Sequence, residues 1–335
     1  MSRLLIVRLG ALGDIVHTIP ALAALRRTWP EARIDWLVDV RHRQVLEQVT
    51  GITTRIHVDS TRGWRQWGSV IRRLRAARYE VAIDFQGLIK SALAARLSGA
   101  RRVAGFAPRL LREPAARWFY TERHAVGGGQ HVIRKNLALA AAVGADPGDI
   151  VFPFEVGHEE PPLPVQGPFA LLNPGAAWPN KRWPPERFGE LAAWLRREYG
   201  LPSIVLWGPG EASLASRVAA ASQGAAHPAP LTTIGDVLAI ARRAVVAVSG
   251  DTGPLHLAAA VETPLVGLYG PTGPARNGPW RADDEWLSRY DRCLCHHERR
   301  CRLPQACIES ITVAEVQDAV ARRLARLGWQ KGAST

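Results

Sequence analysis

Short apolar runs, each followed by a loop and then by apolar residues at helical spacing, recur along the chain and constrain its fold most strongly. Residues 4–7 form the first run, and a glycine-containing loop at 10–14 follows it. Apolar residues then recur with the period of a helix, at Ile15, Ile19, Leu22 and Leu25. Strands that alternate with helices in this way predict a parallel sheet covered by helices on both faces.

The pattern occurs in two blocks. The first block has further predicted strands at 34–38, 55–58 and 81–83, and the second has them at 169–172, 203–207, 245–248 and 264–268. Residues 145–167 lie between the blocks and are rich in Pro, Gly and acidic residues. For 335 residues we therefore predict two doubly wound, Rossmann-like α/β domains, 1–155 and 156–335, which face one another across a cleft.

The charge of the chain points to an acidic partner. Lys and Arg number 43 against 30 Asp and Glu, a formal net charge of +13. Nucleic acid, an anionic membrane and a phosphorylated substrate all fit this charge. Arginine is concentrated without any acid between Asp59 and Glu80, beside Trp64 and Trp67, in a segment that is either a binding surface or a solvated helix face. Its arginines are Arg62, Arg65, Arg72, Arg73, Arg75 and Arg78.

Two absences bear on location and on partners. Arg8 interrupts the first apolar run and no cleavage site follows, so we expect no secretory leader and a cytoplasmic protein. No stretch approaches the ~20 apolar residues of a membrane span, so membrane contact would be peripheral. No recognised nucleic-acid-binding module accompanies the positive charge, and we expect no nucleic-acid partner.

Asp14 is the first candidate catalytic residue. It directly follows the loop after the first predicted strand, which places it at the carboxyl edge of the sheet. A carboxylate there is suited to act as a general base, and Asp is equally common as a helix N-cap. The loop lacks the G-x-G-x-x-G fingerprint, so a dinucleotide site is not indicated.

A second candidate site follows the strand predicted at 245–248. The segment SGDTGPLH, residues 249–256, turns from strand to helix and predicts a phosphate-binding helix N-terminus formed by Thr252 and Gly253. Asp251 is expected to cap this helix or to bind a sugar hydroxyl. His256 is either a buried structural histidine or part of the site.

Basic residues complete this candidate site. Lys181 and Arg182, in the loop after the strand at 169–172, are placed to reach a diphosphate, and Glu211 ends another predicted strand. Neither a P-loop nor a D-x-D pair occurs, so phosphate charge would be met by cations and helix termini rather than by a bridging metal.

All four cysteines lie close together in the sequence, and His296 and His297 are beside them. Their spacing matches no standard zinc module, so a structural zinc or iron site and reduced thiols both stay open. The cysteines are Cys293, Cys295, Cys301 and Cys307.

Six separated motifs together resemble one family. They are RLGALGDIVHTIPALAALR, DFQGLIKSA, LREPAARWFY, the QH of GGGQH, NPGAAWPNKRWP and SGDTGPLHLAAA. Their order is similar to that of bacterial lipopolysaccharide heptosyltransferases, and DFQGLIKSA with REP resembles heptosyltransferase I most closely. The resemblance implies a GT-B fold and metal-independent, inverting transfer of heptose from ADP-L-glycero-D-manno-heptose to Kdo-lipid A in the inner core, with an enzyme at the inner leaflet of the cytoplasmic membrane.

The resemblance also implies roles for particular residues. Asp14 becomes the base and Lys181 the diphosphate partner. The C-terminal domain becomes the donor domain, with contacts from Glu211, Asp251, Thr252, Gly253 and His256. The N-terminal domain becomes the acceptor domain, with contacts from Lys90, Arg112 and His131, and the acidic groups of the acceptor also suit Arg62 and Arg65.

Alternatives to this function are retained. The four-cysteine segment is similar to heptosyltransferase II-like relatives, which would use a heptosylated acceptor. Two other classes of protein also fit part of the pattern. A basic nucleic-acid-binding protein would show tight, salt-sensitive duplex binding. A nucleotide-sugar epimerase would turn over the donor without an acceptor.

Overall fold

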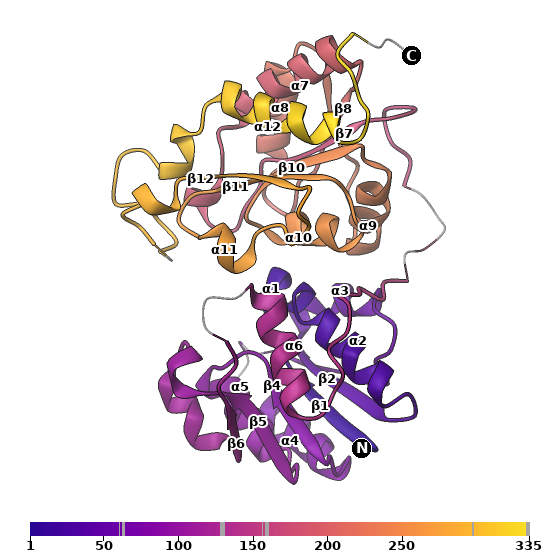
Figure 1. The fold of residues 1–335 in the computed structure, drawn as a ribbon, viewed down its shortest axis with the longest axis vertical. Helices are drawn as coiled ribbons and strands as arrows, with labels where there is room; N and C mark the ends of the chain where they lie inside the picture. Colours follow the sequence, from indigo (N-terminus) through magenta and orange to yellow (C-terminus); the bar gives the residue numbers. More distant parts are fainter. Residues whose placement is uncertain are drawn as a thin grey trace. The chain divides into compact units, whose positions relative to one another are not determined.

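The computed structural model describes residues 1–59, 61, 64–127, 131–155, 157, 161–296 and 298–332, with the side chains of 64–66 outside the described part. The chain divides into two compact units, residues 1–155 and 156–335 (Figure 1). Within the described residues, no helix has both the length and the apolarity that crossing a membrane requires.

Unit 1 is built on a six-stranded, wholly parallel sheet in the order β3-β2-β1-β4-β5-β6. The four strands predicted in this half are present, and β5 and β6 were not predicted. This order reverses direction between β1 and β4, which is the topological switch point of a Rossmann-like sheet. The strands are β1 (Arg3–Val7), β2 (Arg33–Asp39), β3 (Thr54–Val58), β4 (Val81–Asp84), β5 (Arg102–Phe106) and β6 (Glu122–His124).

The helices of unit 1 connect its strands. Pro20 is the second residue of α2, where its missing N–H removes no helical hydrogen bond. The helices are α1 (Leu12–Val16), α2 (Ile19–Thr28), α3 (Arg43–Glu47), α4 (Trp64–Ala76), α5 (Ile89–Leu97) and α6 (Val132–Ala142), with 3₁₀ turns η1 (Val40–His42), η2 (Pro108–Leu110) and η3 (Pro114–Phe119).

Unit 2 repeats the architecture. Its six parallel strands lie in the order β12-β11-β10-β7-β8-β9, the same winding with the switch point between β7 and β10. Here β9 and β12 were not predicted. The strands are β7 (Ala170–Asn173), β8 (Ser203–Val205), β9 (Ala226–Pro228), β10 (Val246–Gly250), β11 (Leu265–Tyr269) and β12 (Glu285–Ser288).

Helices cover the second sheet and close its core. The central strands β7, β10 and β11 are buried along their whole length, as expected for a parallel sheet between two helical layers. The two predicted Rossmann-like domains are thus confirmed. The helices are α7 (Pro185–Tyr199), α8 (Ala212–Ala221), α9 (Ile234–Arg243), α10 (Gly253–Ala260), α11 (Pro274–Asn277) and α12 (Val313–Ala325), with η4 (Pro179–Lys181), η5 (Tyr290–Arg292) and η6 (Cys307–Ser310).

Candidate functional site

Asp14 lies at the switch point of unit 1, paired with a buried arginine. It is the third residue of α1 and not its N-cap, which is Ala11, although the Asp14 carboxylate accepts from the N–H of Ala11 at 3.4 Å. Its carboxylate lies 2.8 Å from Nη2 of Arg8, and the side chain of Asp14 is 34% exposed while that of Arg8 is 7% exposed. Asp14 is therefore both held by a cation and open to solvent, an arrangement suited to accepting a proton from a bound molecule.

Arg8 is a functional candidate that sequence reasoning missed. It follows β1 directly and also donates from Nη1 to the backbone carbonyl of Phe85, just after β4. The side chain of Gln86 accepts from the N–H of Leu9 at 2.7 Å and joins the same two strand ends. An arginine at the end of an otherwise apolar strand was the available signal.

Asp251 is the centre of the polar site in unit 2. It follows β10, is only 4% exposed, and accepts hydrogen bonds from four side chains. One carboxylate oxygen accepts from Lys181 at 2.5 Å and from Thr272 at 2.6 Å. The other accepts from Asn277 at 2.6 Å and lies 3.2 Å from Nε2 of His256. Asp251 therefore positions the one lysine of this site from within the protein.

The charge state of Asp251 follows from these partners. Burial alone would raise the pKa of this carboxyl, but the hydrogen bond from His256 and the charge of Lys181 outweigh burial and leave the pKa below its ordinary value. Asp251 is thus a buried anion. The expectation that it caps α10 is wrong, because the N-cap is Thr252 and no side chain caps that position.

Asn173 connects the two strands at the switch point of unit 2. It ends β7, and its side-chain N–H₂ donates to Oγ of Ser249 at 2.9 Å and to Oγ1 of Thr252 at 3.1 Å. These contacts fix the turn from β10 to α10, which begins at Gly253. Asn173, Thr272 and Asn277 were not predicted as site residues, since single polar side chains between apolar elements give no distinct motif.

The loop between β7 and α7 carries Lys181 and Arg182, and it directs them to different carboxylates. Lys181 also lies over the ring of Trp178, with Nζ 4.8 Å from the ring centroid. Arg182 donates to the carbonyl of Ala176 at 2.8 Å and approaches Glu211 at 3.5 Å. Glu211 is the N-cap residue of α8 and accepts from the N–H of Gly208 at 3.1 Å.

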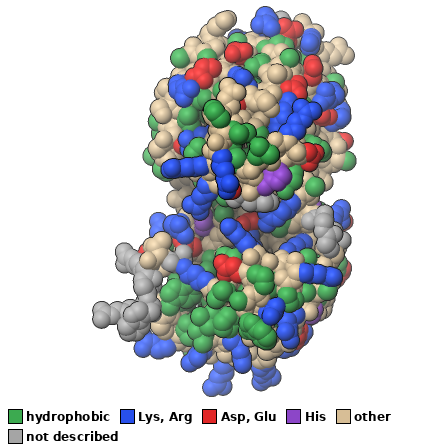
Figure 2. All heavy atoms as spheres, turned by 90° about the vertical axis from the view of Figure 1, so that its left-hand side faces the viewer, with side chains coloured by type: hydrophobic (Ala, Val, Ile, Leu, Met, Phe, Trp, Pro, Cys, Tyr) green, Lys and Arg blue, Asp and Glu red, His purple; other side chains and the backbone are tan. Residues whose placement is uncertain are grey.

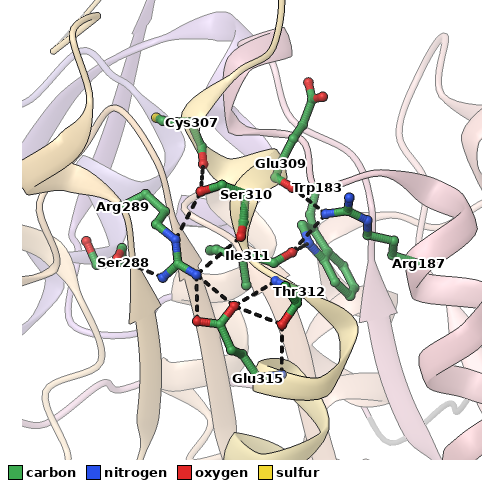
Figure 3. A network of polar contacts seen from close by, with 10 residues as sticks. All are labelled: Trp183, Arg187, Ser288, Arg289, Cys307, Glu309, Ser310, Ile311, Thr312 and Glu315. Atoms are coloured by element: carbon green, nitrogen blue, oxygen red, sulfur yellow. Dashed lines mark hydrogen bonds and ion pairs between the residues drawn. The ribbon is translucent and has the colours of Figure 1, made fainter.

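A polar network anchors the end of this loop (Figure 3). The buried Trp183 donates from its indole N–H to the carbonyl of Ile311 at 2.8 Å, and Arg187 donates to the same carbonyl at 2.9 Å. Arg289 binds both carboxylate oxygens of Glu315 at 2.6 and 2.7 Å, which holds the segment before α12. The end of the loop that carries Lys181 is therefore held by contacts with the C-terminal part of unit 2.

Gly250 permits the close packing of this loop. A Cβ added at Gly250 would lie 2.6 Å from the backbone carbonyl oxygen of Lys181, and a backbone atom has little freedom to move away. We expect Gly250→Ala to reduce the free energy of unfolding by about 1–3 kcal/mol, as overpacking does. The melting temperature, measured by differential scanning calorimetry, checks this expectation.

The matched control for that variant is Gly68→Ala. A Cβ at Gly68, in α4, meets nothing within 4 Å. Since Ala favours a helix over Gly by up to about 1 kcal/mol, Gly68→Ala should be neutral or slightly stabilising. Equal melting temperatures for the two variants would contradict the packing argument.

The expected acceptor residues that the structure describes come from three segments of unit 1. Lys90 lies on α5 with Nζ 5.5 Å from the ring of Trp67, and burial lowers its pKa. Arg112 is exposed between η2 and η3. His131 is the N-cap of α6, where Nδ1 accepts from the N–H of Ile133 at 3.2 Å, and its ring packs edge-on against His17. Arg62 and the side chain of Arg65 lie outside the described residues.

The four cysteines lie in unit 2 between β12 and α12 and form no disulfide. The sulfurs of Cys295 and Cys301 are 3.0 Å apart. A hydrogen bond to Cys293 adds to burial in raising the pKa of Cys307 to about 12. In the described part of the chain, which omits His297, no group of three His, Cys, Asp or Glu side chains could hold a metal ion. The zinc or iron site stays a prediction.

Comparison with known proteins decides the family. The family model described as Glycosyltransferase family 9 (heptosyltransferase) matches residues 67–307. The chain is a member of glycosyltransferase family 9. This confirms the resemblance drawn from the six motifs.

Two curated proteins and one solved structure are similar to the chain over most of their length. Lipopolysaccharide heptosyltransferase 1 of Pseudomonas aeruginosa is 33% identical, with 89% of this chain and 87% of that protein covered. The protein of the same name from Escherichia coli K12 is 31% identical, with 82% and 90% covered. The structure titled E. coli heptosyltransferase WaaC with ADP is 25% identical, has a TM-score of 0.75 and covers 96% of this chain and 99% of its own. This chain and the solved heptosyltransferase structure thus have the same fold.

Proposed function

We propose that this family 9 enzyme transfers heptose from ADP-L-glycero-D-manno-heptose to Kdo-lipid A with inversion at the anomeric carbon. The observation that carries the proposal is the Lys181–Asp251 pair at the switch point of unit 2, beside the N-terminus of α10. A lysine side chain and the N–H groups of a helix N-terminus at one sheet edge are what binding of a nucleoside diphosphate needs. The similarity to heptosyltransferase 1 and to a structure with ADP supports this choice of donor.

The proposed reaction is a single displacement. Asp14 takes the proton of an acceptor hydroxyl, the acceptor oxygen forms a bond to the anomeric carbon, and the bond from that carbon to the diphosphate oxygen breaks. The electron pair of the broken bond leaves with ADP, whose added negative charge Lys181 and the α10 N-terminus stabilise. Attack on the face opposite the leaving group gives inversion. Glu211 and His256 are assigned to the donor site, and Arg8 to positioning Asp14.

The acceptor assignment extends this proposal to unit 1. Lys90, Arg112 and His131 are assigned to the anionic head group, together with Arg62 and Arg65. A glycolipid acceptor places the enzyme at the inner leaflet of the cytoplasmic membrane as a peripheral protein.

Transfer is proposed to require no metal, because Lys181 and a helix terminus meet the diphosphate charge. We therefore expect turnover in excess EDTA to equal turnover in magnesium within about twofold. Removal of a catalytic Lewis acid would instead cost several kcal/mol of charge stabilisation and reduce the rate by orders of magnitude. The measurement is the initial rate of ADP release. A rate that collapses in EDTA and returns with added magnesium would contradict metal-independent transfer.

The decisive experiment is a product assay. The enzyme is incubated with ADP-heptose, with ADP- and GDP-linked hexoses as competing donors. The acceptor is either Kdo-lipid A or a heptosylated Kdo-lipid A. The mass of the lipid product is measured by mass spectrometry. One added heptose on Kdo-lipid A alone supports the proposal. Addition only to the heptosylated acceptor would assign the heptosyltransferase II-like function instead, and consumption of donor without any acceptor would indicate an epimerase.

A further inference from the structure

Apolar side chains gather on an exposed surface of unit 1 formed by α5 and η3, which pack against each other. Ile89 and Leu93 of α5 are 40% and 38% exposed, and Trp118 of η3 is 71% exposed. Ile89 and Leu93 are four residues apart and so lie on one face of the helix. Figure 2 shows hydrophobic side chains grouped on this unit and bordered by Lys and Arg. We call the surface of Ile89, Leu93 and Trp118 the α5–η3 patch.

The sequence around the α5–η3 patch is strongly basic, although Arg102 is paired with Glu122 just beyond it. Between residues 85 and 121 the sequence has a single acid, Glu113, and the carboxylate of Glu113 accepts from the backbone N–H of Ile89 at 2.7 Å. The guanidinium carbon of Arg117 lies 4.6 Å from the centroid of the Trp118 ring. The basic residues of the same segment are Lys90, Arg96, Arg101, Arg102, Arg109, Arg112 and Arg117.

This composition selects one kind of occupant. A tryptophan with an adjacent arginine, two aliphatic side chains and a ring of cations matches the interfacial region of a bilayer, where aromatic rings lie at head-group depth and cations meet lipid phosphates. A protein partner would match both parts only if its apolar surface were bordered by acidic residues. An anionic lipid surface is complementary to both parts at once.

We propose that the α5–η3 patch is the membrane-docking surface of the enzyme and binds bilayers that contain anionic lipid. The inference deepens the proposed function and rests on it, because Lys90 and Arg112, which are assigned to the glycolipid head group, lie on and beside these two elements. Docking through the patch brings the acceptor site to the membrane surface where the acceptor is anchored.

The test compares a patch variant with a matched exposed-apolar variant. The patch variant is Leu93→Glu with Trp118→Ser, and the control is Leu231→Glu, since Leu231 is 76% exposed and lies in unit 2. Binding is measured by cosedimentation with vesicles of phosphatidylethanolamine and phosphatidylglycerol, and with phosphatidylcholine vesicles as the neutral arm. Melting temperatures of all three proteins show that they are folded.

We expect the unaltered protein and the control to bind the anionic vesicles, and the patch variant to bind roughly tenfold more weakly, because it loses interfacial apolar area and gains a repelled charge. Neutral vesicles and 500 mM salt should weaken binding of the unaltered protein. Equal vesicle binding by the patch variant and the control would overturn the proposal, as would no binding by the unaltered protein. Loss of self-association instead, seen by sedimentation velocity, would assign the patch to a second copy of the chain and overturn it too.

Activity separates this inference from the proposed function. With Kdo-lipid A embedded in the anionic vesicles, turnover by the patch variant should fall in step with vesicle binding. With a deacylated, soluble Kdo acceptor, the patch variant and the unaltered protein should turn over equally. Failure of both proteins on both acceptors would reject the proposed function and leave the vesicle result standing. Loss of turnover by the patch variant on the soluble acceptor as well as on the embedded one would instead place the patch in the acceptor site and reject membrane docking.

Discussion

Asp14→Asn is expected to reduce kcat by roughly 10²–10⁴-fold, the scale on which a positioned general base contributes. The amide has the same shape but takes no proton from the acceptor hydroxyl. Arg8 keeps its hydrogen bond to the carbonyl of Phe85 and an amide oxygen within reach, so the fold should be retained. The measurement is the steady-state rate of ADP release, with the melting temperature recorded in parallel.

Asp149→Asn is the matched control for that variant, because Asp149 is an exposed acid of the same unit. Its turnover should equal that of the unaltered protein. Arg8→Lys keeps a cation near Asp14 but cannot use two separate N–H groups to contact Asp14 and the Phe85 carbonyl at once, so it should give an intermediate rate. Near-normal turnover in Asp14→Asn together with early melting would show that Asp14 has a structural role only.

Lys181→Ala is expected to lower kcat by about 10²–10³-fold, the size of the loss when one donor to a developing negative charge is removed. The diphosphate becomes more negative as the glycosidic bond breaks, so the effect should be larger on kcat than on the KM for the donor. The structure adds a cost in stability. Asp251 loses a cation while it stays buried, although the donors Thr272, Asn277 and His256 remain.

Temperature and an added amine separate the two effects of Lys181→Ala. The rate is measured well below the melting temperature of the variant, where it is fully folded, and ethylamine is added to replace the missing ammonium group. Lys331→Ala, which removes an exposed lysine of the same unit, should leave the rate unchanged. Full turnover of Lys181→Ala at low temperature without amine would show that the lysine acts on folding alone.

The alternation of apolar runs and loops was sufficient to predict both sheets and their doubly wound form. The edge strands β6, β9 and β12 were missed because they are three or four residues long and only partly buried, so they lack the continuous apolar signal of β1 or β10. Strand β5 was missed although four of its five residues are buried, since Arg102 and Gly105 interrupt its apolar run.

The candidate site was predictable where glycine and charge fall together after a strand. Asp14, Lys181 and Asp251 stand out for that reason. The partners that position them do not, because Arg8, Thr272 and Asn277 come together only through the fold. The interpretation of Asp251 as a cap failed on this point. Its local sequence favours capping of α10, whereas the N-cap is Thr252, and the Asp251 carboxylate contacts the side chains of Thr272, Asn277 and His256.

The ion pair between Lys181 and Asp251 has a kinetic consequence. A lysine already neutralised by a buried carboxylate offers a diphosphate less net attraction than an isolated one would. On the proposed mechanism ADP carries more negative charge than the diphosphate of the bound donor, so the carboxylate weakens binding of ADP more than binding of the donor. The same effect takes away part of the transition-state stabilisation that Lys181 supplies. The carboxylate behind the lysine thus favours departure of ADP and limits product inhibition, at a cost in the rate of the chemical step.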